Sequence, residues 1–177
     1  MNDNDGDIIS LIGRRRGIEL AKKHIDDMET MLEYEKVICD FKGIQNMTVS
    51  FLDGFYECLR EKIKRNNVIE LNNVQGELLE EIEAFFSFRK TKYGESLAFV
   101  FRDKQEYRLI GNVDAASLAT FEYLKDGKEI TPRYLADQEG IEINAASNRL
   151  ARLFQKGVVF RKEIINSEGK MFYYFLK

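Results

Sequence analysis

Hydrophobic and polar residues alternate along the first half of the chain in a pattern that predicts strands and helices in turn. Short apolar runs of strand length are separated by longer stretches in which apolar residues recur at helical spacing. The predicted order is a strand at 7–12, a helix at 14–34, a strand at 36–41, a helix at 51–63, a strand at 68–71 and a helix at 78–86. This β-α-β-α-β-α alternation favours an α/β fold with a largely parallel sheet covered by helices.

The polar and basic stretch 89–96 breaks this pattern. Two β-rich runs follow at 97–101 and 107–110, so residues 89–111 are interpreted as a linker that could contain short strands. A helix through part of this stretch is the alternative. The division expected is a first domain at 1–88, the linker, and a second domain at 112–177.

From Asp114 onward the pattern predicts three helices and a β-hairpin. Thr131-Pro132 is expected to open the second of these helices, and Gly140 to end it. Asn144 is expected to cap the third helix, which Gly157 closes. The hairpin is predicted from two β-rich runs, 158–161 and 171–175.

The stretch 134–150 resembles the core of the winged helix-turn-helix family, and the likeness extends over about the last third of the chain. In this pattern Ala136 is small where two helices cross, Gly140 permits the turn, and Ile141, Leu150 and Leu153 fill the core. The resemblance implies a winged helix domain at 112–177. Domains of this class bind DNA or dock other proteins.

Charge is distributed unevenly along the chain. The net charge is −3 and the pI is about 5.4, so the molecule as a whole does not attract nucleic acid. Between Asn144 and Lys177, however, seven residues are basic and two are acidic, whereas the rest of the chain has 20 basic and 28 acidic residues. Positive charge therefore gathers on the predicted third helix and wing, where phosphate contacts would form. The residues predicted to contact DNA are Asn148, Arg149, Arg152, Lys156, Arg161, Lys162 and Lys170. Capping and solvation are the alternative for Asn148, and protein docking is the alternative for the whole domain.

The run from Val37 to Asp53 resembles a bacterial STAS-like domain family, in which a strand ending in Asp-Phe leads to a serine at the start of a helix. Asp40-Phe41 and Ser50-Phe51 carry this likeness, which spans about residues 7–88. The resemblance implies a domain that docks a protein partner, often a kinase with a histidine-kinase-like ATP fold that phosphorylates a serine or threonine at this helix start. Thr48 and Ser50 are therefore candidates for a phosphorylation or partner switch.

Two features near the helix starts allow alternative interpretations. Members of that family that act as anti-sigma-factor antagonists have Asp-Ser-Ser-Gly where this chain has Thr48-Val49-Ser50-Phe51. In addition, Asp53 lies three residues after Ser50, which is the spacing of a capping box. We therefore expect Ser50 to be a plain helix cap. Arg14, Arg15 and Arg16 place three cations where they oppose a helix dipole, either as a solvated charge run or as a site for an anion or an acidic partner.

Residues that could carry catalysis are sparse. The single histidine, His24, lies among charged residues of a predicted helix, and the sequence contains no phosphate-binding loop, no Cys-x-x-Cys pair and no dinucleotide fingerprint. Cys39 and Cys58 are expected to be buried free thiols in a reducing compartment. No apolar run is long enough to span a bilayer, and the N-terminus lacks the features of a signal peptide. We expect a cytoplasmic protein without membrane contact, cofactor or metal.

The hypothesis from sequence is a non-enzymatic regulator or adaptor, in which a STAS-like α/β domain docks a protein partner and a winged helix-turn-helix domain binds DNA in transcription regulation. A homo-oligomer is compatible with it. The alternative is a structural subunit of a larger protein assembly, whose winged helix mediates protein-protein contacts.

Overall fold

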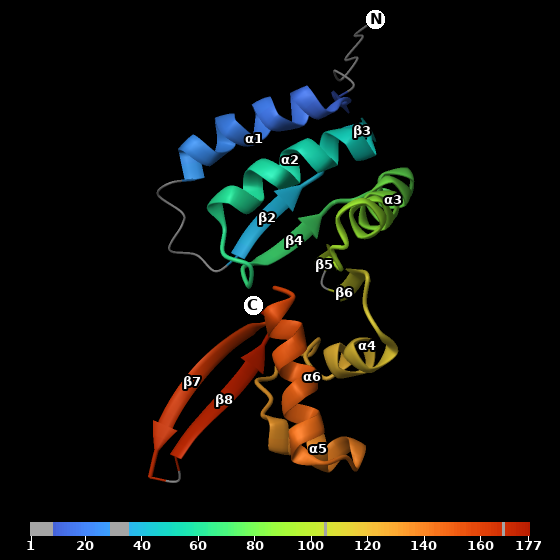
Figure 1. The fold of residues 1–177 in the computed structure, drawn as a ribbon. Helices are drawn as coiled ribbons and strands as arrows, with labels where there is room; N and C mark the ends of the chain where they lie inside the picture. The colour runs from blue at the N-terminus through green and yellow to red at the C-terminus, as the bar shows by residue number, and fades with distance from the viewer. Residues whose placement is uncertain (1–8, 29–35, 105, 168) are drawn as a thin grey trace, which may run out of the picture.

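The computed structural model describes residues 9–28, 36–104, 106–167 and 169–177. Over these residues the chain is a mixed α/β protein with six helices and eight strands (Figure 1). The elements in chain order are β1 Ile9–Leu11, α1 Arg14–Met28, β2 Lys36–Asp40, β3 Ile44–Met47, α2 Val49–Lys62, β4 Val68–Asn72, α3 Gly76–Tyr93, β5 Ala98–Asp103, β6 Glu106–Gly111, α4 Ala115–Glu122, α5 Pro132–Glu139, α6 Ile143–Gln155, β7 Phe160–Asn166 and β8 Gly169–Phe175. The predicted helix at 14–34 and strand at 7–12 are confirmed over 14–28 and 9–11; residues 29–34 and 7–8 lie outside the described part.

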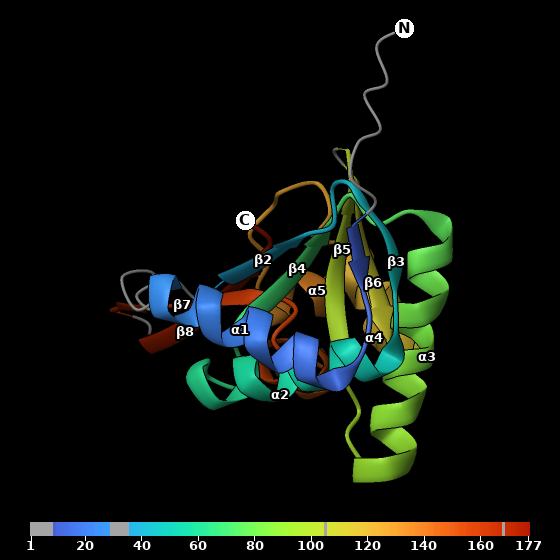
Figure 2. The same cartoon turned by 90° about the horizontal axis from the view of Figure 1, so that it is seen from above.

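A sheet with the strand order β2-β4-β5-β6 forms the centre of the fold, as Figure 2 shows from above. Strands β2, β4 and β5 are parallel, and β6 is antiparallel to β5. The predicted alternation of strands and helices, with a largely parallel sheet, is therefore confirmed for this part of the chain. Strand β3, which the sequence did not predict, pairs in parallel with β1 as a separate two-stranded sheet.

Each face of the central sheet packs against a different set of helices. Along β5, Phe99 and Phe101 belong to a core with α2 and α3, whereas Ala98 and Val100 belong to a second core with α4 to α6 and the hairpin. Successive residues of a strand point to opposite faces, so this division follows from the strand itself. Burial of both faces explains why β5 is apolar over most of its length.

Residues 89–111, expected to be a linker, contain the end of α3 and both strands β5 and β6. The two β-rich runs within this stretch are confirmed as strands, and β5 joins the sheet through β4. The division into domains at 1–88 and 112–177 stays a prediction.

Two of the capping predictions are wrong. Thr48, not Ser50, caps α2, because its hydroxyl accepts the amide hydrogen of Phe51 at 3.3 Å. Helix α6 begins two residues earlier than expected, with Glu142 at the capping position, so Asn144 lies inside the helix. For α5, the predicted Thr131 cap with Pro132 at the first helical position is confirmed, and left-handed Gly140 follows the helix.

Helices α1 and α2 approach each other through two glycines. A Cβ atom at Gly17 would overlap the carbonyl oxygen of Phe51, and one at Gly54 would overlap the carbonyl oxygen of Arg14. Glycine at both positions therefore permits backbone contact between the two helices, which lie side by side on the sheet in Figures 1 and 2.

Candidate functional site

Helix α6 has one buried face and one exposed face. Ala146, Leu150 and Leu153 are fully buried in the second core, whereas Asn148 and Arg152 point to solvent. The helical repeat explains this arrangement, because residues three and four apart share a face. The first turn of α6 and the tip of the β7–β8 hairpin both lie at the end of the molecule that is remote from the central sheet (Figure 1).

Arg149 and Lys156, two of the residues predicted to contact DNA, have partners within the chain. Arg149 forms an ion pair with Glu139 at the end of α5, and both side chains are largely covered. The Lys156 ammonium donates to the carbonyl and hydroxyl oxygens of Ser96 and to the carbonyl oxygen of Asn112, each at 3.1 Å. Burial lowers the pKa of Lys156. Lys156 thus fastens the end of α6 to the sheet, and its three donors are all used.

The predicted cations of the hairpin are held more loosely. The guanidinium of Arg161 lies between the rings of Phe154 and Phe172, 4.2 and 4.4 Å from their centroids. Lys162 pairs with Glu129 at 2.5 Å, and Lys170 pairs with Glu163 at 2.7 Å. Both pairs are solvated and worth at most about 1 kcal/mol. A phosphate group could therefore compete for these lysines.

The hairpin also exposes two apolar side chains near its tip. Ile164 is 40% exposed and Ile165 is 76% exposed. They lie in β7 opposite Met171 and Lys170 of β8. This tip therefore combines apolar side chains with the lysines of the flanking strands.

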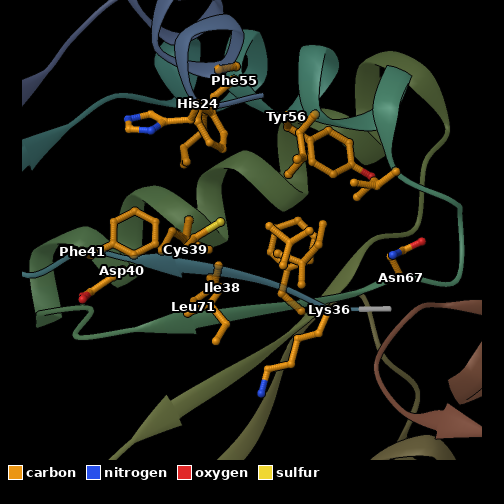
Figure 3. Close-up of a pocket in the computed structure, with 18 of the residues that line it drawn as sticks. His24, Lys36, Ile38, Cys39, Asp40, Phe41, Phe55, Tyr56, Asn67 and Leu71 are labelled. Atoms are coloured by element: carbon orange, nitrogen blue, oxygen red, sulfur yellow. The ribbon is translucent and has the colours of Figure 1, made fainter. Parts of the chain in front are cut away.

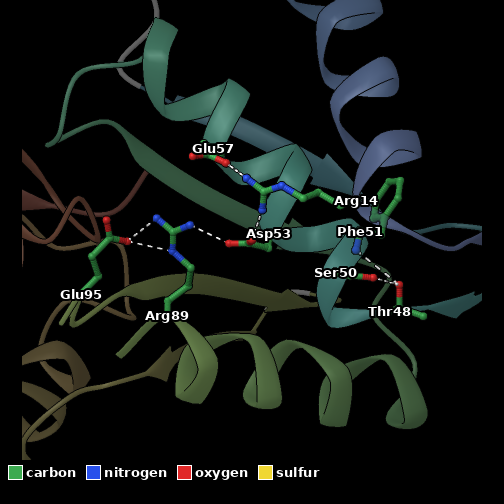
Figure 4. Close-up of polar contacts among 8 residues, drawn as sticks. All are labelled: Arg14, Thr48, Ser50, Phe51, Asp53, Glu57, Arg89 and Glu95. Atoms are coloured by element: carbon green, nitrogen blue, oxygen red, sulfur yellow. Dashed lines mark hydrogen bonds and ion pairs between the residues drawn. The ribbon is translucent and has the colours of Figure 1, made fainter. Parts of the chain in front are cut away.

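The start of α2, which includes both candidate switch residues, is occupied by contacts within the chain (Figure 4). The Thr48 hydroxyl, which caps α2 by accepting from the amide of Phe51, also accepts from the amide of Gly13 at 3.2 Å. It lies 3.1 Å from the Ser50 hydroxyl. Glu81 of α3 accepts from the amide of Val49 at 3.1 Å. Thr48 thus has a structural role, whereas Ser50 is exposed.

An ion-pair network, not predicted from the sequence, joins the first three helices (Figure 4). Asp53 is 3% exposed and pairs with Arg14 of α1 and, at 2.6 Å, with Arg89 of α3. Arg14 also pairs with Glu57, and Arg89 pairs with Glu95 at 2.7 Å. Burial is the largest single contribution to the pKa of Arg89 and lowers it. The hydrogen bonds and charges of Asp53 and Glu95 together outweigh burial, so the pKa is raised.

Asp53 is therefore the centre of this network and not a member of a capping box. The apolar stripe through Phe51, Phe55 and Leu59 lies on another side of α2, so the hydrophobic pattern gave no signal for a buried Asp53. The three consecutive arginines do not act together: Arg14 belongs to the network, Arg15 pairs with Glu19 at 2.9 Å, and Arg16 is exposed.

A cavity of about 1140 Å³ lies between α1, α2 and strands β2 and β4 (Figure 3). Its lining is mainly apolar and aromatic, and His24 and Asp40 are among its polar residues. Cys39 points into it from β2, and burial raises the pKa of its thiol to about 12. The thiol is therefore protonated near neutral pH, which makes it a weak nucleophile. Cys58 is a half-buried free thiol on α2.

Comparison of the chain with models of protein families, with curated proteins and with solved structures gave no match. In the described part of the chain, no helix combines the length and apolar composition needed to cross a membrane. Within these same residues, His, Cys, Asp and Glu side chains form no group of three that could hold a metal ion.

Proposed function

We propose that this protein is a non-enzymatic regulator or adaptor that binds duplex DNA through α6 and the β7–β8 hairpin. The last third of the chain would be a winged helix-turn-helix domain, with α6 as the recognition helix and the hairpin as the wing. Packing of α4 and α5 against α6, left-handed Gly140 before α6, and the antiparallel hairpin after it support this assignment.

The observation that carries the proposal is the common position of two polar features. The exposed side of α6 presents Asn148, and the hairpin presents Lys162 and Lys170 in weak surface pairs. Because the first turn of α6 and the hairpin tip lie at the same end of the molecule, one duplex could contact both (Figure 1). Lys156 would not contribute, since its ammonium is fully engaged at the other end of α6.

The test is the salt dependence of binding to a short fluorescent duplex, measured by anisotropy. We expect Lys162→Ala/Lys170→Ala to reduce the slope of log affinity against log salt by about two, because each phosphate contact contributes about 0.9. The matched control is Lys90→Ala/Lys92→Ala, which removes the same charge from exposed positions on α3. Absence of salt-dependent binding by the wild type, or an equal change in the control, would contradict the proposal.

A second candidate is a structural subunit of a larger assembly, in which the same domain docks a protein. The exposed Ile164 and Ile165 favour it, as does the overall charge of residues 112–177, which include ten basic and nine acidic residues. In this case a partner should co-purify with the wild type and with Lys162→Ala/Lys170→Ala, but not with Ile164→Ser/Ile165→Ser. Retention of the partner by the isoleucine variant would exclude the hairpin tip as the docking surface.

The first domain would be STAS-like and would dock a protein partner, such as a histidine-kinase-like ATPase. Its β-α-β order and exposed Ser50 at the start of α2 support this part of the proposal. Phosphate on Ser50 would lie beside the Thr48 hydroxyl, so modification would disturb the cap of α2. Mass spectrometry of protein from its native cells tests the switch: phosphate elsewhere, but not on Ser50, would contradict it.

A further inference from the structure

A second positively charged region lies where the two cores meet, at the end of α6 that is remote from the proposed DNA contacts. A cleft of about 600 Å³ is bounded there by the end of α2, the starts of β4 and β5, and the end of α6. Four cationic side chains line it: Arg60, Arg65, Arg152 and Lys156. Arg152 and Lys156 were predicted to contact DNA, and the structure places them at this cleft instead of at the hairpin tip.

The charges of this cleft are not balanced by its own carboxylates. Glu95 is the acidic side chain among its described lining residues, and it already pairs with Arg89. The side chains of Arg65 and Arg152 form no ion pair or hydrogen bond with a described residue, and both are exposed, while Arg152 acts electrostatically on Asp114. Asp114 and, to a smaller extent, Arg65 also act electrostatically on the ammonium of Lys156, so the positive side chains of α2 and α6 are close enough to interact.

The rest of the lining suits a small ligand with polar groups. Gln155 offers a hydrogen-bonding side chain, and Tyr56 and Phe99 form part of an aromatic wall. The volume lies within the range of sites for small molecules and is too small to admit a nucleic-acid duplex. The guanidinium groups of arginine match the bidentate geometry of phosphate oxygens, and Arg60, which donates one hydrogen bond to the Lys64 carbonyl oxygen, has further donors.

We propose that this cleft binds a small molecule that contains a diphosphate group, with Arg60, Arg65 and Arg152 contacting its oxygens. Lys156 adds positive charge to the cleft while it holds the end of α6 in place. The diphosphate could be inorganic or part of an organic ester such as a nucleotide, and both have the same recognition chemistry. This site does not depend on the proposed DNA contacts, because the first turn and the end of α6 are about 18 Å apart.

Calorimetric titration of the full chain with pyrophosphate and with ADP tests the proposal. We expect binding of one or both, weakened about tenfold or more by Arg60→Ala/Arg65→Ala and unchanged by Lys90→Ala/Lys92→Ala. Tighter binding of ADP would identify an organic ester as the source, and tighter binding of pyrophosphate an inorganic one. A thermal unfolding curve for each variant shows whether it is folded, and Arg65→Glu provides a second variant at a side chain that forms no ion pair or hydrogen bond with a described residue.

Three results would overturn the proposal. The first is absence of binding by both compounds at millimolar concentration, and the second is binding that the cleft variants do not weaken. The third is loss of pyrophosphate or ADP binding in Lys162→Ala/Lys170→Ala while the cleft variants still bind, because this result would place the ligand at the hairpin. The DNA proposal is judged separately, since the changes to Arg60 and Arg65 leave the hairpin lysines intact.

Discussion

Replacing Gly54 by alanine should push α1 and α2 apart and destabilise the protein. The added Cβ would overlap the carbonyl oxygen of Arg14 and lie 3.0 Å from Cγ of the same residue. A backbone carbonyl cannot rotate away as a side chain can, so one helix must move. Overpacking of this kind costs up to about 3 kcal/mol. Alanine is the better helix former by about 1 kcal/mol, which leaves a net loss of about 2 kcal/mol.

The assay is urea unfolding followed by circular dichroism, with thermal unfolding as a second measurement. A loss of about 2 kcal/mol corresponds to a fall of roughly 4–8 °C in Tm for a chain of this length. Gly17→Ala should behave similarly, because its Cβ would overlap the Phe51 carbonyl oxygen. Gly76→Ala is the control, since a Cβ there meets nothing within 4 Å. If Gly54→Ala were as stable as the wild type, the close approach of the helices would be refuted.

Three further predictions concern buried or capping groups. Asp53→Ala leaves a buried arginine short of a partner and should cost about 3 kcal/mol in urea unfolding, whereas a loss below about 1 kcal/mol would contradict the role of the network. Burial raises the pKa of the Cys39 thiol to about 12. In a Cys58→Ser variant, this thiol should therefore react with iodoacetamide at pH 8 much more slowly in the folded than in the unfolded protein. Equal rates would argue against burial. The pKa of Asp114 is lowered by the amide and hydroxyl of Ser117, so the ionised cap stabilises the fold above the ordinary pKa of 3.8, and this contribution is lost as pH falls through the lower folded value. Asp114→Asn should therefore lose less stability than the wild type below about pH 4; parallel pH profiles would rule out this contribution.

Local patterns were sufficient to predict most helices and the strands of the central sheet, because apolar spacing and glycine positions are properties of neighbouring residues. Strand β3 was missed, since its four residues, Ile44–Met47, are short and carry polar side chains at the centre. They form a strand because β1 lies beside them, a contact between residues about 35 positions apart. Tertiary pairing of this kind overrides local propensity.

The candidate sites were less predictable for the same reason. Arg149 and Lys156 are cations in a basic segment, but their partners Glu139 and Ser96 lie outside the segment over which charge was counted. Asp53 likewise has the spacing of a capping residue, and only the packing of α1 and α3 against α2 reveals its two arginine partners. A charge sum along the chain describes composition and does not describe which charges remain available.

The sharing of β5 between two cores has a consequence for how the chain unfolds. Ala98 and Val100 complete the core beneath α6, while Phe99 and Phe101 complete the core beneath α2. A fragment that begins at residue 112 would lack the first pair, and a fragment that ends at residue 111 would expose it to water. We therefore expect both halves to melt in a single cooperative transition. A ligand that binds to one half should then raise the melting temperature of the other half as well.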